Sequence, residues 1–128
     1  MHIVFGGLFN GKRQYVKVHL KPTIVIDSDI QSLNVSDQIV SIENFPQLVL
    51  PYVVYDEVIA SDIVFTYIQQ IAKSNVVICV CDDISRGVVP MDATERKTRD
   101  ILGRLYQQLF IEAKTITRIW YGIPETLK

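Results

Sequence analysis

The residues best suited to chemistry lie near the amino end, in a glycine-rich stretch that ends in a lysine. Glycines let the backbone turn so that successive N–H groups face one anion, and a lysine ammonium at this spacing reaches the outer phosphates of a nucleotide. The stretch fits the pattern G-x-x-x-x-G-K and directly follows an apolar run. We therefore predict a phosphate-binding loop made of Gly6, Gly7, Leu8, Phe9, Asn10, Gly11 and Lys12.

The residue after the lysine departs from this pattern. A Ser or Thr normally follows and binds Mg²⁺ through its hydroxyl, but Arg13 stands there instead. A guanidinium only donates hydrogen bonds, so it is no metal ligand, although it can fork onto phosphate oxygens. We predict that the loop binds ATP or GTP, with Arg13 on a phosphate and with Mg²⁺ as a second cofactor whose usual ligand has been replaced. The alternative is a strand-to-helix turn that carries two solvated basic residues.

Carboxylates follow two of the later apolar runs. Glu43 follows the third run, and Asp82 and Asp83 follow the fourth. Acidic side chains in such places can hold Mg²⁺ or orient a substrate hydroxyl. We select Lys12, Glu43 and Asp83 as candidate catalytic residues, and Glu43 and Asp83 also as candidate metal ligands. Acids at strand ends also form turns that cap the next segment, which is the alternative for each position.

Further cations and aromatic residues need a choice between a ligand role and a structural one. Arg86 lies in a turn, and we expect it either to close over a bound phosphate or to stay solvated. Arg96 and Arg99 can face phosphate, or they can form a solvated helix face on which they pair with Glu95 or Asp100. The aromatic pair near the carboxyl end is interpreted as core or subunit interface rather than as a base-stacking platform.

Short β-branched runs alternate with longer stretches of helical period, which is typical of a parallel sheet with its chemistry at the carboxyl ends of the strands. Gln14–Leu20 alternates and favours a strand, although the preceding turn would lead into a helix. Pro46–Tyr55 is interrupted by a proline, so we expect irregular or edge structure there. The predicted strands are Ile3–Phe5, Thr23–Ile26, Ile39–Ile42, Val76–Val80 and Ile116–Tyr121, and the predicted helices are Asp56–Lys73 and Ala93–Lys114.

Length and charge bound the class of protein. With 128 residues, 48% of them hydrophobic, the chain suits one domain over residues 1–128 with a sizeable core. Its 13 Lys and Arg against 14 Asp and Glu exclude a strongly basic surface for nucleic acid. No apolar run is long enough to span a membrane and the start lacks the features of a secretory signal, so we expect a cytoplasmic protein. Cys79 and Cys81 would share one strand face as reduced, buried thiols.

Two sets of residues at opposite ends of the chain share a further pattern. In the first set, Gly6, Gly7, Gly11, Lys12 and Tyr15 match a loop of the form Gly-Gly-x-x-Ser-Gly-Lys-Ser that is followed by a tyrosine. The second set matches the runs Gly-Ile-Val-Pro and Arg-x-x-Arg-Asp-x-x-Gly-x-x-Asn-Gln at Gly87–Pro90, Arg96, Arg99, Asp100, Gly103 and Gln107. It departs from the pattern at Tyr106, which replaces the Asn, and at Asp82-Asp83, which stand where the pattern has Asn-Glu. Together they resemble the adenosylcobinamide kinase/adenosylcobinamide-phosphate guanylyltransferase family, in which Glu43 would be the acid at the end of a strand.

The resemblance implies an α/β fold, a P-loop NTPase-like three-layer sandwich with a mostly parallel sheet of about five strands. Family members phosphorylate the aminopropanol hydroxyl of adenosylcobinamide, then transfer GMP from GTP through a guanylylated histidine, and they form ring-like trimers. That histidine belongs to a helical segment after the second strand, where this chain has the short link Ser28–Ser36 without a histidine. By this resemblance we expect a nucleotide and a corrinoid as partners, a homo-oligomer, and no guanylyltransferase half.

Three functions follow from these interpretations. The first is a nucleotide- or phosphate-binding protein that resembles adenosylcobinamide kinase of cobalamin biosynthesis but has weak or lost catalysis. The second is an active kinase, a phosphotransferase that acts on adenosylcobinamide. The third is a scaffold or regulatory subunit that has kept the fold and no longer binds nucleotide.

Overall fold

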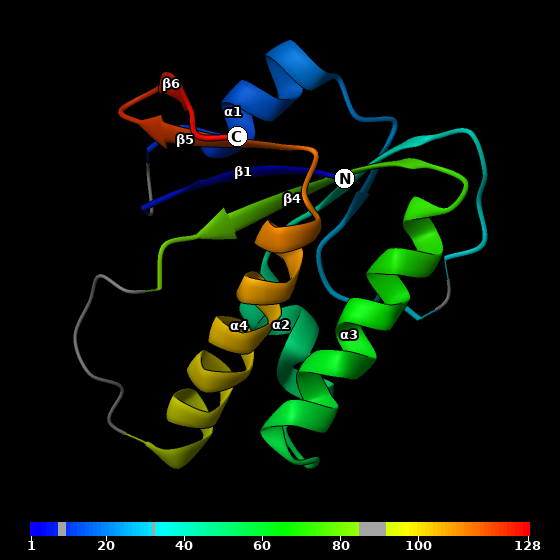
Figure 1. The fold of residues 1–128 in the computed structure, drawn as a ribbon, viewed down its shortest axis with the longest axis vertical. Helices are drawn as coiled ribbons and strands as arrows, with labels where there is room; N and C mark the ends of the chain where they lie inside the picture. Colours follow the sequence, from blue (N-terminus) through cyan, green and yellow to red (C-terminus); the bar gives the residue numbers. More distant parts are fainter. Residues whose placement is uncertain (8–9, 32, 85–91) are drawn as a thin grey trace.

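The computed structural model describes residues 1–7, 10–31, 33–84 and 92–128, which contain a six-stranded sheet (Figure 1). The strands are β1 (His2–Gly6), β2 (Ile24–Ile26), β3 (Ile39–Ile42), β4 (Val76–Asp82), β5 (Thr115–Trp120) and β6 (Ile123–Thr126). They lie in the order β2-β3-β4-β1-β5-β6, with every pair parallel except β5 and β6. Because parallel strands end at one edge, the segments after β1, β3 and β4 meet there.

Helices cover both faces of this sheet. On one face α1 (Lys12–Tyr15) continues into a π-helical segment, Val16–Leu20. On the other face lie α2 (Phe45–Val49), α3 (Glu57–Ala72) and α4 (Ala93–Glu112), as Figure 1 shows. The arrangement is an α/β three-layer sandwich of the P-loop NTPase-like type, which confirms the predicted fold class.

Side chains alternate across the central strands into two cores, one on each face. Ile3 of β1 and Cys79 of β4 pack in the core with α2, α3 and α4, whereas their neighbours Val4 and Ile78 pack with Val16 on the α1 side. Each of these five side chains is at most 3% exposed. Burial on both faces explains why these strands appear in the sequence as continuous apolar runs.

The two cysteines occupy one of these cores. Cys79 and Cys81 are buried, lie on the same face of β4 and carry free thiols, as predicted. Burial raises the pKa of the Cys79 thiol to about 12, so this group stays protonated at neutral pH. The pair therefore contributes packing to the core.

Both long helices begin where the sequence predicts. The Asp56 carboxylate caps α3 by accepting a hydrogen bond from the Val58 N–H at 2.9 Å. The Asp92 carboxylate caps α4 by accepting from the Glu95 N–H at 2.7 Å. Such caps satisfy N–H groups that the first helical turn leaves without partners.

Three local predictions differ from the structure. Gln14–Leu20 is helical and not a strand, because it continues the helix that starts at Lys12 and buries only Val16 against the sheet. The irregular or edge structure expected for Pro46–Tyr55 is also wrong. That segment holds most of α2 and the 3₁₀ turn Leu50–Tyr52. Pro46 and Pro51 each lie at the start of one of these helical segments, where a proline is tolerated. The sixth strand, β6, had no counterpart among the predicted strands.

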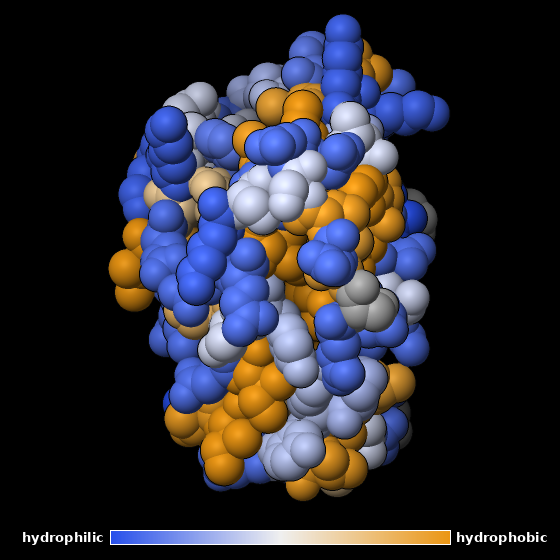
Figure 2. Space-filling view, turned by 90° about the vertical axis from the view of Figure 1, so that its right-hand side faces the viewer, coloured by the Kyte–Doolittle hydropathy of each residue, from blue (hydrophilic) through white to orange (hydrophobic). Residues whose placement is uncertain are grey.

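Hydrophobic side chains also reach the surface where α2 ends and α3 begins. Leu50, Val54, Val58 and Ile59 are between 41% and 80% exposed there. The face drawn in Figure 2 likewise shows orange patches among blue charged groups toward the lower end of the molecule. Apolar patches of this kind often mark interaction surfaces, and the homo-oligomer stays a prediction.

We predict that Gly6→Ala destabilises the fold, because a Cβ atom at Gly6 would lie 2.5 Å from the backbone oxygen of Ile119. Strand β5 would have to move, at a cost of about 2 kcal/mol. The expected fall in the melting temperature is roughly 5–15 °C, measured by circular dichroism. Gly103→Ala is the matched control, because the nearest described side chain that its Cβ would meet is Ile84, at 4.0 Å. Equal melting temperatures for the two variants would contradict the prediction.

Candidate functional site

A hollow of about 510 Å³ opens at the carboxyl edge of the sheet, beside the glycine-rich loop. Its volume lies within the range of sites that hold small molecules and cofactors. Segments that follow β1 and β3 and the end of β4 all contribute to it. The described residues that line this hollow, here named the loop hollow, are Gly11, Lys12, Arg13, Gln14, Glu43, Asn44, Val80 and Asp82.

The loop backbone takes the turn that its glycines allow. Gly11 has a φ of 89°, in the left-handed region that favours glycine, and it directly precedes the helix that starts at Lys12. The Asn10 carbonyl accepts a hydrogen bond of 2.8 Å from the Gly122 N–H, so the turn between β5 and β6 supports the loop from outside. Leu8 and Phe9, which were also predicted to bind phosphate, lie outside the described residues.

Lys12 is held across the loop that it belongs to. Its ammonium donates to the Gly7 carbonyl at 2.7 Å and forms an ion pair with Asp82 Oδ1 at 2.8 Å. The residue is only 6% exposed. This fixes a positive charge at the loop hollow, and it also places a carboxylate where it competes with phosphate for that charge.

Arg13 and Glu43 form a second ion pair at the same hollow. Arg13 Nε lies 3.5 Å from Glu43 Oε1, and the Glu43 backbone N–H donates to the Ile26 carbonyl, which fixes the residue beside β2. The Arg13 side chain is 69% exposed and that of Glu43 is 17% exposed. The arginine is therefore loosely held and can reach a ligand in the hollow.

These pairs leave a poor set of ligands for Mg²⁺. Asp82 is already paired with Lys12, and Glu43 is paired with Arg13, the residue that replaces the usual hydroxyl ligand. Among the described residues, no three His, Cys, Asp or Glu side chains gather as a metal site would require. A divalent cation would also face the positive charges of Lys12 and Arg13, so the donor set does not fit it.

Asp82 and Asp83 differ in the hollows that they line. Asp83 lines a second hollow beside α4 and not the loop hollow, whereas Asp82 borders both. Within β4, Val80 lines the loop hollow and Cys81 the second one, as alternation along a strand requires. The structure thus brings Glu43 together with Asp82 at the loop hollow, and places Asp83 next to Gly6, whose carbonyl accepts its backbone N–H at 2.8 Å.

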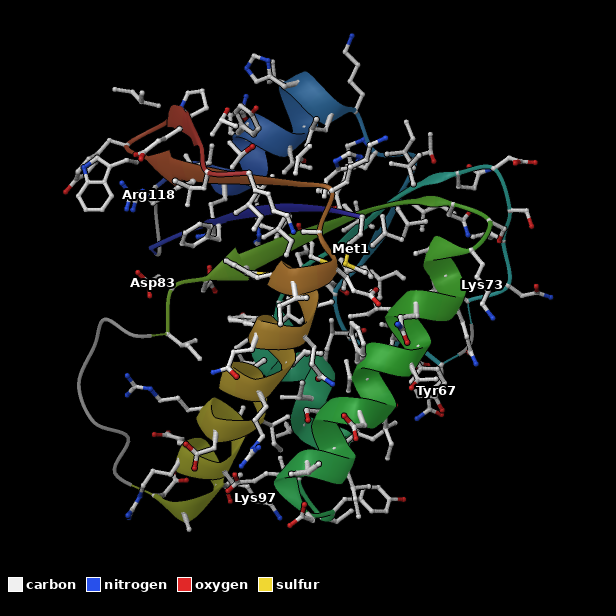
Figure 3. All side chains as sticks on the ribbon, viewed as in Figure 1. Met1, Tyr67, Lys73, Asp83, Lys97 and Arg118 are labelled. Carbon is white, nitrogen blue, oxygen red and sulfur yellow. The ribbon has the colours of Figure 1, made fainter. Side chains whose placement is uncertain are left out.

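Arg96 and Arg99, two of the predicted cations beyond the loop, are not among the described residues that line this hollow. Arg86 lies outside the described residues. Arg96 and Arg99 belong to the first turns of α4, and in Figure 3 the neighbouring Lys97 lies far from Asp83 at the end of β4. A role for these two arginines at the phosphates therefore has no support from their position.

The aromatic pair near the carboxyl end lies on the surface of the β5–β6 hairpin. Trp120 is 40% exposed and Tyr121 is 78% exposed, so the interpretation as core is wrong for both. The guanidinium of Arg118 lies 5.6 Å from the centroid of the Trp120 ring. The sequence analysis did not predict that this hairpin supports the loop. The signal in the sequence is Gly122, because a glycine after a strand is typical of a tight turn, and in the structure its φ is 78°.

Comparison with known proteins then decides the family. Residues 30–127 match the family model described as cobinamide kinase / cobinamide phosphate guanyltransferase. The chain belongs to this cobinamide kinase family. The match begins after β2, so the glycine-rich loop lies outside it and depends on its own pattern and geometry. No curated protein matches the chain.

Membership of the cobinamide kinase family supports a nucleotide-binding, kinase-like protein of cobalamin biosynthesis. A nucleotide and a corrinoid are the substrates that fit this family. None of the described helices is long and apolar enough to cross a membrane.

We predict that Asp82→Asn strengthens the binding of inorganic triphosphate, because it removes the carboxylate that competes for the Lys12 ammonium. A partly exposed ion pair is worth about 1 kcal/mol, so the expected gain in affinity by calorimetry is roughly five-fold. Glu125→Gln is the control, since it removes the same charge from the pair with Arg118. Equal gains in both variants would show that only net charge matters.

Proposed function

We propose that this member of the cobinamide kinase family binds the phosphates of ATP or GTP in the loop hollow without requiring Mg²⁺, and that its transfer activity is weak or lost. The observation that carries the proposal is Arg13, a cation that stands next to Lys12 in the place of the hydroxyl that holds the metal. Phosphoryl transfer needs the charge between the β- and γ-phosphates to be neutralised by a correctly held metal ion. A guanidinium neutralises charge but supplies no such geometry.

The two cations of the hollow suit a phosphate chain. Lys12 is fixed beside the loop by Gly7 and Asp82, whereas Arg13 is largely exposed and held only by a pair of 3.5 Å to Glu43. A guanidinium forms two parallel hydrogen bonds to phosphate oxygens, so Arg13 can leave Glu43 for a stronger partner. Together the fixed and the movable cation account for phosphate binding without a metal.

The histidines support loss of the guanylyltransferase half. His2 lies at the amino end of β1, the end opposite to the loop, with Nδ1 hydrogen-bonded to Thr115 Oγ1 at 2.7 Å. Burial lowers the pKa of the His2 imidazole. His19 lies in the π-helical segment with its ring 4.8 Å from that of Tyr15. Neither is among the residues that line the loop hollow.

The proposal also covers the cellular location and the oligomeric state of the protein. A cytoplasmic location and a homo-oligomer, a trimer by analogy with the family, stay predictions. The exposed apolar side chains at the start of α3 favour self-association, which size-exclusion chromatography with light scattering measures directly.

We predict that wild-type protein binds ATP, and GTP likewise, with affinities that change by less than about two-fold when Mg²⁺ is added. In Arg13→Ser the hydroxyl ligand returns, and Mg²⁺ should then strengthen binding by at least about five-fold. Lys12→Met should bind at least about ten-fold more weakly in either condition. Isothermal titration calorimetry with and without Mg²⁺ measures all three.

Lys17→Ser is the matched control, because it removes an exposed positive charge from the same helix beyond the loop hollow. It should behave as the wild type does. No heat with either nucleotide would refute the proposal and leave the scaffold function. Mg²⁺-dependent turnover of cobinamide would refute the loss of catalysis and favour an active kinase.

A further inference from the structure

A second hollow of about 320 Å³ lies beside the loop hollow, between the end of β4 and α4. Its walls are mainly apolar and aromatic, formed by Phe5, Ile84, Tyr106 and Phe110. The aromatic rings pack against one another. The ring centroids of Phe5 and Phe110 lie 5.3 Å apart in an edge-to-face arrangement, and those of Tyr106 and Phe110 lie 6.3 Å apart in a stacked one. We name this the aromatic hollow.

The aromatic hollow contains a buried hydroxyl whose proton has no acceptor. The Tyr106 oxygen meets the backbone amide of Asp82, but among the described residues nothing accepts a hydrogen bond from its O–H group. A buried O–H without an acceptor is costly, so such a group in a hollow favours a ligand that accepts from it. Burial also raises the pKa of Tyr106 well above its usual value, so the hydroxyl keeps its proton and can donate.

The aromatic hollow adjoins the candidate nucleotide site. Asp82 borders both hollows, and its carboxylate holds the Lys12 ammonium at 2.8 Å. A group in the aromatic hollow would therefore lie across one strand end from the phosphates. With Asp83 also on its rim, the hollow presents carboxylate and phenol beside an apolar wall.

We propose that the aromatic hollow binds the second ligand of this protein, an apolar group that carries a hydroxyl or amide. The inference rests on the proposed function, because the bound nucleotide makes this position the side of the acceptor. The apolar part would lie against Phe5 and Phe110, and the polar group would bond to the Tyr106 hydroxyl. A volume of about 320 Å³ takes a side arm of a larger molecule rather than a macrocycle. The proposal concerns binding alone.

Cobinamide, the acceptor in the description of the family, is the probe. Gly103 lies in α4 on the wall of the aromatic hollow, and the nearest described side chain that a Cβ there would meet is Ile84, at 4.0 Å. Ile111→Met, at an exposed position of the same helix outside the hollow, is the control and should bind cobinamide as the wild type does. Gly103→Met should fill the hollow and weaken cobinamide binding by at least about ten-fold, with ATP binding unchanged. Unchanged cobinamide affinity in Gly103→Met would overturn the proposal.

Tyr106→Phe tests the hydroxyl separately and does not depend on filling the hollow. It should weaken cobinamide binding by about five-fold, leave ATP binding unchanged, and keep or raise the melting temperature, because a buried O–H without an acceptor has been removed. Unchanged cobinamide affinity would overturn the role of the hydroxyl. Wild-type protein that binds ATP but not cobinamide would refute this inference alone, whereas failure to bind ATP or GTP would refute the proposed function.

Discussion

The constraint on which the rest depends is the burial of β1 between β4 and β5 in parallel register. Gly6 at the end of β1 lies opposite Asp82 at the end of β4, so the glycine-rich loop starts beside a carboxylate. The same register packs the Gly6 backbone against Ile119 of β5 too closely for any side chain. β3, on the other side of β4, brings Glu43 to the same edge. The order of the strands thus brings the residues of the site together at one edge of the sheet.

Charge at this edge is balanced pair by pair. Each cation of the loop hollow faces one carboxylate: Lys12 faces Asp82 at short range, and Arg13 faces Glu43 at longer range. The short pair holds a nearly buried ammonium, which would be costly to keep charged without a partner. The longer pair lies largely in solvent and contributes little to stability. Lys12 is therefore fixed in the fold, whereas Arg13 is free to move toward a ligand. Two cationic side chains thus supply the positive charge that a bound metal ion would otherwise provide.

The parts of the structure that depend on periodicity could be predicted from the sequence. Ile39–Ile42 agrees residue for residue, because its apolar pattern is buried on both faces. Gln14–Leu20 could not, since alternating apolar and basic residues fit a strand and a one-sided helix equally well, and the position after the loop decides between them. All four residues of β6 are exposed and one of them is a proline, so only its pairing with β5 defines it. At the site, the spacing of the glycines and the lysine was enough to indicate the loop. Which of Asp82 and Asp83 lines the loop hollow could not be predicted, because it depends on which face of the sheet each residue of β4 points to.

The position of β1 also has a consequence for how the chain is made. His2, in the first strand, is hydrogen-bonded to Thr115 in β5, 113 positions later. β1 is synthesised before both of its neighbours in the sheet, β4 and β5, and is therefore among the last of these strands to be paired on both sides. Contacts so distant in sequence form slowly, so the apolar side chains of β1 are not buried in the sheet until β4 and β5 have been made. Nucleotide cannot assist this early stage, since the edge that would receive it does not exist until β4 and the β5–β6 hairpin have joined the sheet.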